Sequence, residues 1–225
     1  DRGFGMKQLF LILLAFAATL WGAWLFAAAR QSIQGEKMTG HTLFRLSDQA
    51  MLPVMFVSNA AVGLFLAGYY KLGTVDILRT LLILGVLWAC AWADARAFLI
   101  PNRVVAMGAA AGVLVLLVEI LRNPGTALYQ AINVVAAAVA MLVASLLCRI
   151  ISPKSIGMGD VKLLAVMGIC LGMGLVWSAV FCSLIVLFCY CCFLLLTKRA
   201  AKSDSVPLAP FLLLGTLVAA FITGI

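Results

Sequence analysis

Charged residues are scarce in this sequence: 16 basic and 8 acidic residues are spread over 225 positions. About a quarter of a soluble domain is charged, so this chain has too little polar surface for a water-soluble globule. Seven uncharged runs of 14 residues or more are mainly apolar, and none shows the alternating polarity of a transmembrane barrel strand. The sequence therefore predicts an all-α, polytopic membrane protein.

Histidine and paired cysteines are also scarce. The one histidine, His41, lies in a polar stretch with no neighbour that suggests catalysis or a metal site. The seven cysteines all lie in apolar runs, and no second pair joins the C-x-x-C spacing of Cys189 and Cys192. Cysteines in such runs usually behave as small buried apolar residues. We therefore predict no metal ion and no cofactor.

The net charge of +8 would suit nucleic-acid binding, but the basic residues lie in short segments between apolar runs. That distribution orients transmembrane helices. We therefore predict that the protein contacts membrane lipids and does not bind nucleic acid. The apolar pattern predicts eight spans, at residues 8–29, 50–70, 75–93, 104–121, 126–149, 161–174, 176–197 and 206–225.

The uncharged run 163–197 is too long for one span. A helix of this length would measure about 52 Å, whereas the hydrocarbon core is about 30 Å thick. Gly172 and Gly174 offer a break between two shorter helices. The first of these would be too short to cross unaided, which suits a helix that borders a water-filled cavity.

Basic residues also predict the orientation of the spans. With the N-terminus outside, the inner segments hold eleven basic residues, including the Lys198–Lys202 cluster. The outer loops hold only Lys71, Arg79 and Arg122, and Arg2 and Lys7 lie in the N-terminal tail. The positive-inside rule favours this arrangement in the cytoplasmic (inner) membrane. Residues 30–49 then form the longest cytoplasmic loop. The first five residues, which precede Met6, look like the remnant of an expression tag.

Two aspartates stand out among the few acidic residues. Asp94 follows an apolar run and precedes Arg96 and the pair Pro101-Asn102. Asp160 ends the segment Gly157-Met-Gly-Asp160, where an apolar helix begins. Both fall at cytoplasmic helix ends, where two carboxyl groups that share one proton and a water could form an aspartic-peptidase dyad.

The segment around Asp160 carries further signals. Gly157 and Gly159 allow tight backbone packing or a positive φ before the helix, and Lys162 lies close enough to tune charge or hold a substrate carboxylate. The positive end of the helix dipole stabilises a carboxylate, so we predict Asp160 as the base and Asp94 as the acid. Asp76, Asp204 and Glu119, the last beside Arg122, are interpreted as ordinary interfacial residues.

Both segments resemble one family. Asp94-Ala-Arg-Ala-Phe-Leu-Ile-Pro-Asn102 resembles the stretch that follows the first catalytic aspartate of type IV prepilin peptidases. Gly157-Met-Gly-Asp-Val-Lys-Leu-Leu164 resembles their G-x-G-D motif, and Val206–Leu212 is similar to their proline-containing final helix. The resemblance covers about residues 75–225, so we expect one membrane domain over 6–225, with two spans and a loop in 6–74 and a catalytic core in 75–225.

The resemblance implies an aspartic endopeptidase that removes the basic leader from pilin-like precursors, whose apolar helix follows the leader, at the cytoplasmic membrane face. Asp94 and Asp160 would be catalytic, and a second group would support them or bind substrate: Gly157, Gly159, Lys162, Arg96, Pro101 and Asn102. The longer members of the family carry a cytoplasmic insert with zinc-type cysteine pairs and also methylate their product. Residues 30–49 contain no cysteine, so we predict the short form without methyltransferase activity.

Two other functions remain open on the sequence alone. Intramembrane proteases of the presenilin or signal-peptide-peptidase kind also contain G-x-G-D, but Asp94 does not follow a tyrosine, and Pro207-Leu-Ala-Pro210 only faintly resembles their Pro-Ala-Leu. Carboxylates in membrane helices also mark transporters, and a scaffold without catalytic activity is possible. A transporter is disfavoured because the predicted spans carry no charge in their middle. The sequence also lacks an inverted repeat that is broken by proline or glycine.

Overall fold

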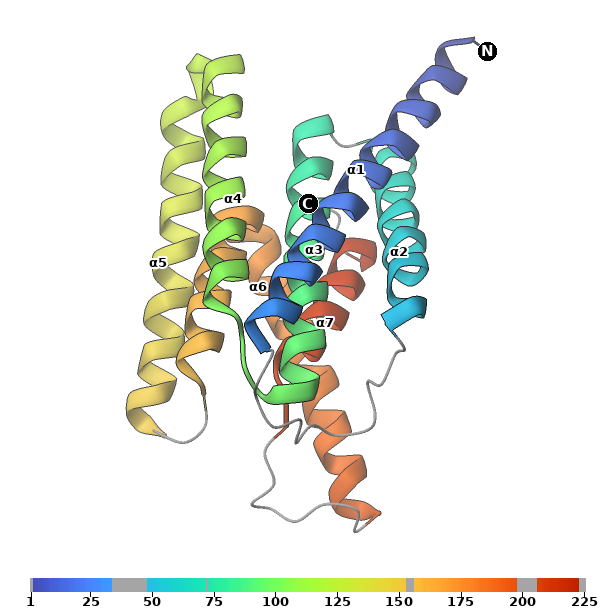
Figure 1. Ribbon diagram of the computed structural model, residues 1–225. Coiled ribbons are helices and arrows are strands. Elements are labelled where there is room, and N and C mark those ends of the chain that lie inside the picture. The colour runs from blue at the N-terminus through green and yellow to red at the C-terminus, as the bar shows by residue number, and fades with distance from the viewer. Residues whose placement is uncertain (1, 34–47, 72, 153–155, 198–205, 223–225) are drawn as a thin grey trace.

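The computed structural model describes residues 2–33, 48–71, 73–152, 156–197 and 206–222, and these residues form α-helices with short connections (Figure 1). The helices are α1 (Arg2–Ile33), α2 (Asp48–Gly68), α3 (Thr74–Ala97), α4 (Asn102–Arg122), the short 3-10 turn η2 (Pro124–Thr126), α5 (Ala127–Ile151), α6 (Met158–Leu196) and α7 (Ala209–Ile222). The first six α-helices are long and apolar enough to cross a membrane, and α7 is shorter. The prediction of an all-α, multi-pass membrane protein is confirmed. The predicted loop around His41, the Lys198–Lys202 cluster and Asp204 lie outside the described residues.

Helix α6 is broken where its length and glycines predicted a break. Gly172 has φ 69° and ψ −177°, so two helical arms meet there. Figure 1 shows that the first arm runs into the bundle and the second arm returns towards the end where α6 begins. The first arm, residues 158–171, is about 21 Å long and is too short to cross a hydrocarbon core of about 30 Å. With the two arms counted separately, the described residues contain eight α-helical segments, which is roughly compatible with the eight predicted spans.

A side chain of α5 satisfies the backbone at this break. The N–H of Met173 donates a hydrogen bond to Asn133 Oδ1 at 3.1 Å. A Cβ on Gly172 would lie 3.0 Å from Asn133 Nδ2, so glycine is required here by its positive φ and by the available space. An unpaired backbone N–H is costly within a membrane. Asn133 therefore stabilises the return of the α6 chain.

Replacement of Asn133 by leucine removes this acceptor, and we expect the Asn133→Leu variant to lose about 1–3 kcal/mol of unfolding free energy. Gln130 on the same helix is a matched control, because its Oε1 is buried without a hydrogen-bond partner among the described residues. Thermal unfolding in detergent measures both variants. A Gln130→Leu variant that is destabilised as strongly as Asn133→Leu would contradict the role of Asn133.

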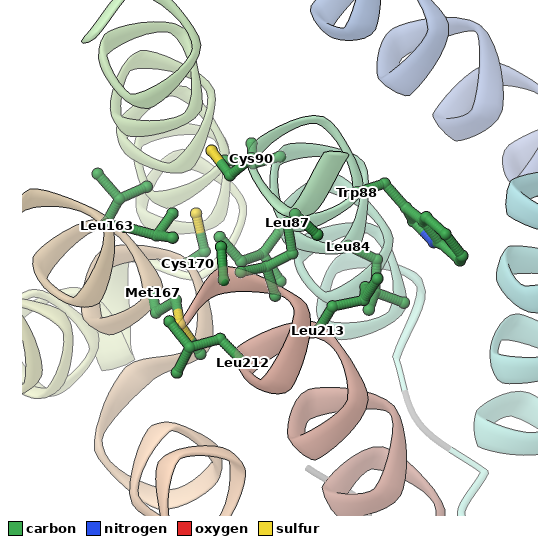
Figure 2. Close-up of a cluster of buried hydrophobic side chains, with 14 of the residues drawn as sticks. Leu84, Leu87, Trp88, Cys90, Leu163, Met167, Cys170, Leu212 and Leu213 are labelled. Atoms are coloured by element: carbon green, nitrogen blue, oxygen red, sulfur yellow. The ribbon is translucent and has the colours of Figure 1, made fainter. Parts of the chain in front are cut away.

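Helix α3 lies at the centre of the bundle and is buried along most of its length. It packs against α1, α2, α4, α6 and α7, while the two arms of α6 pack mainly on α5 and α7. Figure 2 shows the core that joins these elements: Leu84, Leu87 and Cys90 from α3 lie near Leu163, Met167 and Cys170 from α6 and Leu212 and Leu213 from α7. This core holds the C-terminal half of α3 against the start of α6.

An ion pair joins α3 to α4 towards the other end of the bundle. The Arg79 guanidinium pairs with the Glu119 carboxylate, and their side chains are only 11% and 12% exposed. The sequence placed Arg79 in an outer loop and Glu119 at a helix end beside Arg122. The placement of Arg79 is wrong, because α3 begins five residues before it and the shielded pair allows the charge to lie inside a helix. Glu119 lies in the last turn of α4, close to Arg122, as expected.

Candidate active site

Asp94 lies in the last turn of α3, and its residue is only 6% exposed. Its Oδ2 accepts a hydrogen bond of 2.9 Å from the N–H of Ala209, the first residue of α7. The predicted span ended at residue 93, but α3 continues to Ala97. Asp94 is therefore fixed by its own helix and by the start of α7.

Asp160 is the third residue of α6, and its Oδ2 accepts a hydrogen bond of 3.1 Å from the N–H of Gly157. The Gly157 backbone is extended, with φ −70° and ψ 153°. The sequence allowed either tight backbone packing or a positive φ at this glycine, and its negative φ leaves tight packing. Asp160 Oδ1 is buried and has no hydrogen-bond partner among the described residues. One carboxylate oxygen thus caps the helix while the other is left for a further interaction.

The start of α6 is in contact with the connection between α3 and α4. A Cβ on Gly159 would lie 2.9 Å from Ile100 Cβ, so only glycine allows this approach. Lys162 Nζ donates a hydrogen bond of 3.0 Å to Asn102 Oδ1. Pro101 is buried and precedes α4 with φ −66°. The structure therefore brings the two predicted motifs together, and Lys162 joins one to the other.

Arg96 has a different environment. Its guanidinium lies 4.5 Å from the centre of the Trp92 ring, a cation–π arrangement. The Trp92 ring in turn meets Phe26 of α1 edge-on, with 4.6 Å between ring centres. Arg96 was predicted to support the site, and the structure places its guanidinium on the side of α3 that faces α1.

The carboxyl groups of Asp94 and Asp160 lie close enough to interact electrostatically. Cys90, one turn before Asp94, is close enough to interact with both. Two carboxyl groups in this relation favour sharing one proton. The arrangement can thus supply an acid and a base to the same reacting group, the pairing that hydrolysis of a peptide bond needs.

Sequence reasoning missed the backbone donor at Ala209. The stretch Val206–Leu212 was noted only for its prolines. One signal was present: Ala209 lies between Pro207 and Pro210, and the first N–H groups of a helix have no partner within that helix. A donor at this position is therefore free to bind a carboxylate on a neighbouring helix.

Comparison with known families agrees with this geometry. The model of the type IV leader peptidase family matches residues 81–225, which is more than half of the chain. The chain belongs to the type IV leader peptidase family. The match includes both aspartates, most of α3, all of α4 to α7 and the contacts between the two motifs. No curated protein and no solved structure matches the chain.

Membership of this family makes the chain a leader-peptidase-like protease, and the family implies a prepilin-like protein as substrate. The matched region begins within α3, so α1 and α2 lie outside it. Both helices nevertheless pack against α3. The N-terminal pair thus supports the helix that carries Asp94.

Proposed function

We propose that this protein is a membrane aspartic endopeptidase that removes the short basic leader of type IV pilin-like precursors at the cytoplasmic membrane face. The observation that carries the proposal is that the carboxyl groups of Asp94 and Asp160 lie near each other. They come from different helices and interact electrostatically, at the end of the bundle where α3 ends and α6 begins (Figure 1). Family membership supports the reaction class.

In the proposed mechanism Asp160 acts as the general base. Its unpartnered Oδ1 accepts a proton from the attacking water, and its place in the first turn of α6 favours the carboxylate through the helix dipole. Asp94 donates its proton to the carbonyl oxygen as the water oxygen bonds to the carbonyl carbon. The hydrogen bond from Ala209 to Asp94 Oδ2 holds this carboxyl in place for the proton transfer.

Collapse of the tetrahedral intermediate completes the reaction. The C–N bond breaks, the leaving amine takes the proton that Asp160 received from water, and the intermediate's hydroxyl returns a proton to Asp94. The dyad then again holds one proton, so the cycle is closed without another reactant. Lys162, Asn102 and Gly159 keep the two motifs in contact, and Gly157 binds the Asp160 carboxylate through its N–H. We assign these residues a supporting role.

The substrate's apolar helix would lie in the membrane beside the bundle and present its leader junction to the dyad. Purified protein in lipid vesicles, incubated with a pilin-like precursor, tests the function. We expect one cut between the basic leader and the apolar segment, seen by N-terminal sequencing. Cleavage only within a transmembrane segment would favour the presenilin-like alternative, and no cleavage of any precursor would favour a transporter or scaffold.

The same product tests the prediction of proteolysis without methylation. Residues 30–49 contain no cysteine, whereas the longer relatives carry cysteine pairs in their insert. With S-adenosylmethionine present, mass spectrometry is expected to find a free N-terminal amine on the cleaved protein. A gain of one methyl group that depends on S-adenosylmethionine would contradict this prediction.

Membrane orientation is tested separately. Ser152 and Gly125 are exposed and lie at opposite ends of α5, and the distribution of basic residues puts Ser152 at the cytoplasmic face. In a variant depleted of native cysteine, we expect Gly125→Cys to react with an impermeant thiol reagent in intact cells. Ser152→Cys is expected to react only after permeabilisation. The reverse pattern would invert the proposed topology.

A further inference from the structure

Arg149 reaches the segment around Asp160 from a different helix. It lies in the last turn of α5, and its Nη1 donates a hydrogen bond of 2.8 Å to the carbonyl oxygen of Ile156. Ile156 immediately precedes Gly157, the residue whose N–H binds the Asp160 carboxylate. The Arg149 side chain is half-buried, so this hydrogen bond is partly shielded from water.

The two hydrogen bonds use opposite sides of one peptide group. The C=O of Ile156 and the N–H of Gly157 belong to the same planar unit. This unit accepts the hydrogen bond from Arg149 and donates one of 3.1 Å to Asp160 Oδ2. Hydrogen bonds in such a chain polarise and strengthen one another, and an ionised group at each end strengthens them further. The Arg149 guanidinium and the Asp160 carboxylate are therefore coupled through a single peptide group.

We propose that Arg149 is a positioning residue for the Asp160 base, and this inference rests on the proposed function. By holding the peptide group between Ile156 and Gly157, Arg149 fixes the direction of the N–H that binds Asp160 Oδ2. The other oxygen, Oδ1, is buried without a hydrogen-bond partner among the described residues, and it is then held ready for the attacking water. Arginine suits this role because its guanidinium is rigid and always protonated.

The kinetic test compares Arg149→Leu with Arg149→Lys in the precursor assay. Without the guanidinium the peptide group can turn, so Arg149→Leu is expected to lower kcat by about 10–100-fold, the cost of a small misplacement of a reacting group. KM is expected to stay within about twofold, because Arg149 acts on Asp160 and not on the substrate. Arg149→Lys keeps a positive charge and an N–H donor, and it is expected to recover part of the lost kcat.

Arg103→Leu is the matched control. Arg103 is exposed in the first turn of α4, near the end of α3 that carries Asp94. Its replacement removes one basic residue from the same end of the bundle and leaves the hydrogen bond to Ile156 intact. We expect this variant to cleave at the wild-type rate. A role of Arg149 in folding alone would lower the melting temperature and leave kcat per folded molecule unchanged.

A spectroscopic test observes the peptide group itself. Ile156-Gly157 is the only Ile-Gly pair in the sequence. Protein labelled with ¹³C-carbonyl isoleucine and ¹⁵N-glycine therefore gives a single carbonyl-filtered amide signal, that of the Gly157 N–H. Arg149→Leu and Asp160→Asn are each expected to move its proton resonance upfield, because the hydrogen bond to residue 160 becomes weaker. Arg103→Leu is expected to leave the signal in place.

A Gly157 signal that does not move in Arg149→Leu would overturn this inference, and so would a kcat within about twofold of the wild-type value. The proposed function would stand in either case, because the wild-type protein still cleaves. Failure of the wild-type protein to cleave any precursor would overturn the proposed function and this inference with it.

Discussion

Asp94→Asn and Asp160→Asn are each expected to abolish precursor cleavage, with kcat lowered by at least about 1,000-fold, a loss typical of removing one member of a catalytic unit. An asparagine has nearly the shape of aspartate but can neither take the proton from water nor donate one to the carbonyl oxygen. At position 94 its amide oxygen can still accept the hydrogen bond from Ala209. The variants should therefore insert and accumulate like the wild-type protein, which quantitative immunoblotting of membranes checks.

Asp76 provides the matched control. It lies in the first turn of the same helix α3, at the opposite end from Asp94, so Asp76→Asn removes a carboxylate without changing the dyad. We expect this variant to cleave the precursor at the wild-type rate. Cleavage by Asp94→Asn or Asp160→Asn at more than about a tenth of the wild-type rate would remove that residue from the mechanism.

The sequence predicted the fold best where an uncharged run was longer than one membrane span. The run 163–197 was too long for one span and contained Gly172, and the structure breaks at that glycine. Helix ends were less accurate. Helix α3 continues past its apolar run to Ala97, where the left-handed conformation of Phe98 ends it. The sequence did not predict this end, because a phenylalanine does not signal a left-handed conformation. Helix α7 begins only at Ala209, between two prolines.

For the site, the sequence predicted which residues come together but not how they touch. Asp94 and Asp160 were found from local motifs. One of their contacts, the hydrogen bond from Gly157 to Asp160, is local in sequence. The approach of Gly159 to Ile100 and the hydrogen bond from Ala209 to Asp94 depend on tertiary packing, because they join segments that are distant in sequence. A backbone donor is not identified by its own residue type, and for Ala209 only the flanking prolines gave a signal. Asn133 was missed for a related reason, since its partner is a backbone N–H that only the break in α6 exposes.

The ion pair of Arg79 and Glu119 is expected to show the largest effect on stability. Because both side chains are only 11% and 12% exposed, removal of one partner leaves a shielded charge without its ion pair. We expect Arg79→Leu or Glu119→Leu to lower the unfolding free energy by about 3 kcal/mol, the lower end of the range for buried pairs, because Asp76 and Arg122 lie around the same pocket as Glu119. Thermal unfolding in detergent measures the loss of stability. The precursor assay, run well below the melting temperature, measures whether the variants still cleave.

The double variant Arg79→Leu with Glu119→Leu is the decisive control. Replacing both charges by apolar residues removes the cost of burying them, and such replacements are often neutral or stabilising. We therefore expect the double variant to be far more stable than either single variant and to cleave normally, since Arg79 lies fifteen residues before Asp94 on α3, about 22 Å along the helix. Additive losses in the double variant would show that the two charges act independently. The shielded pair would then contribute nothing to the register of α3 against α4, and the position of Asp94 would depend on the remaining contacts of α3 with α1, α2, α4, α6 and α7.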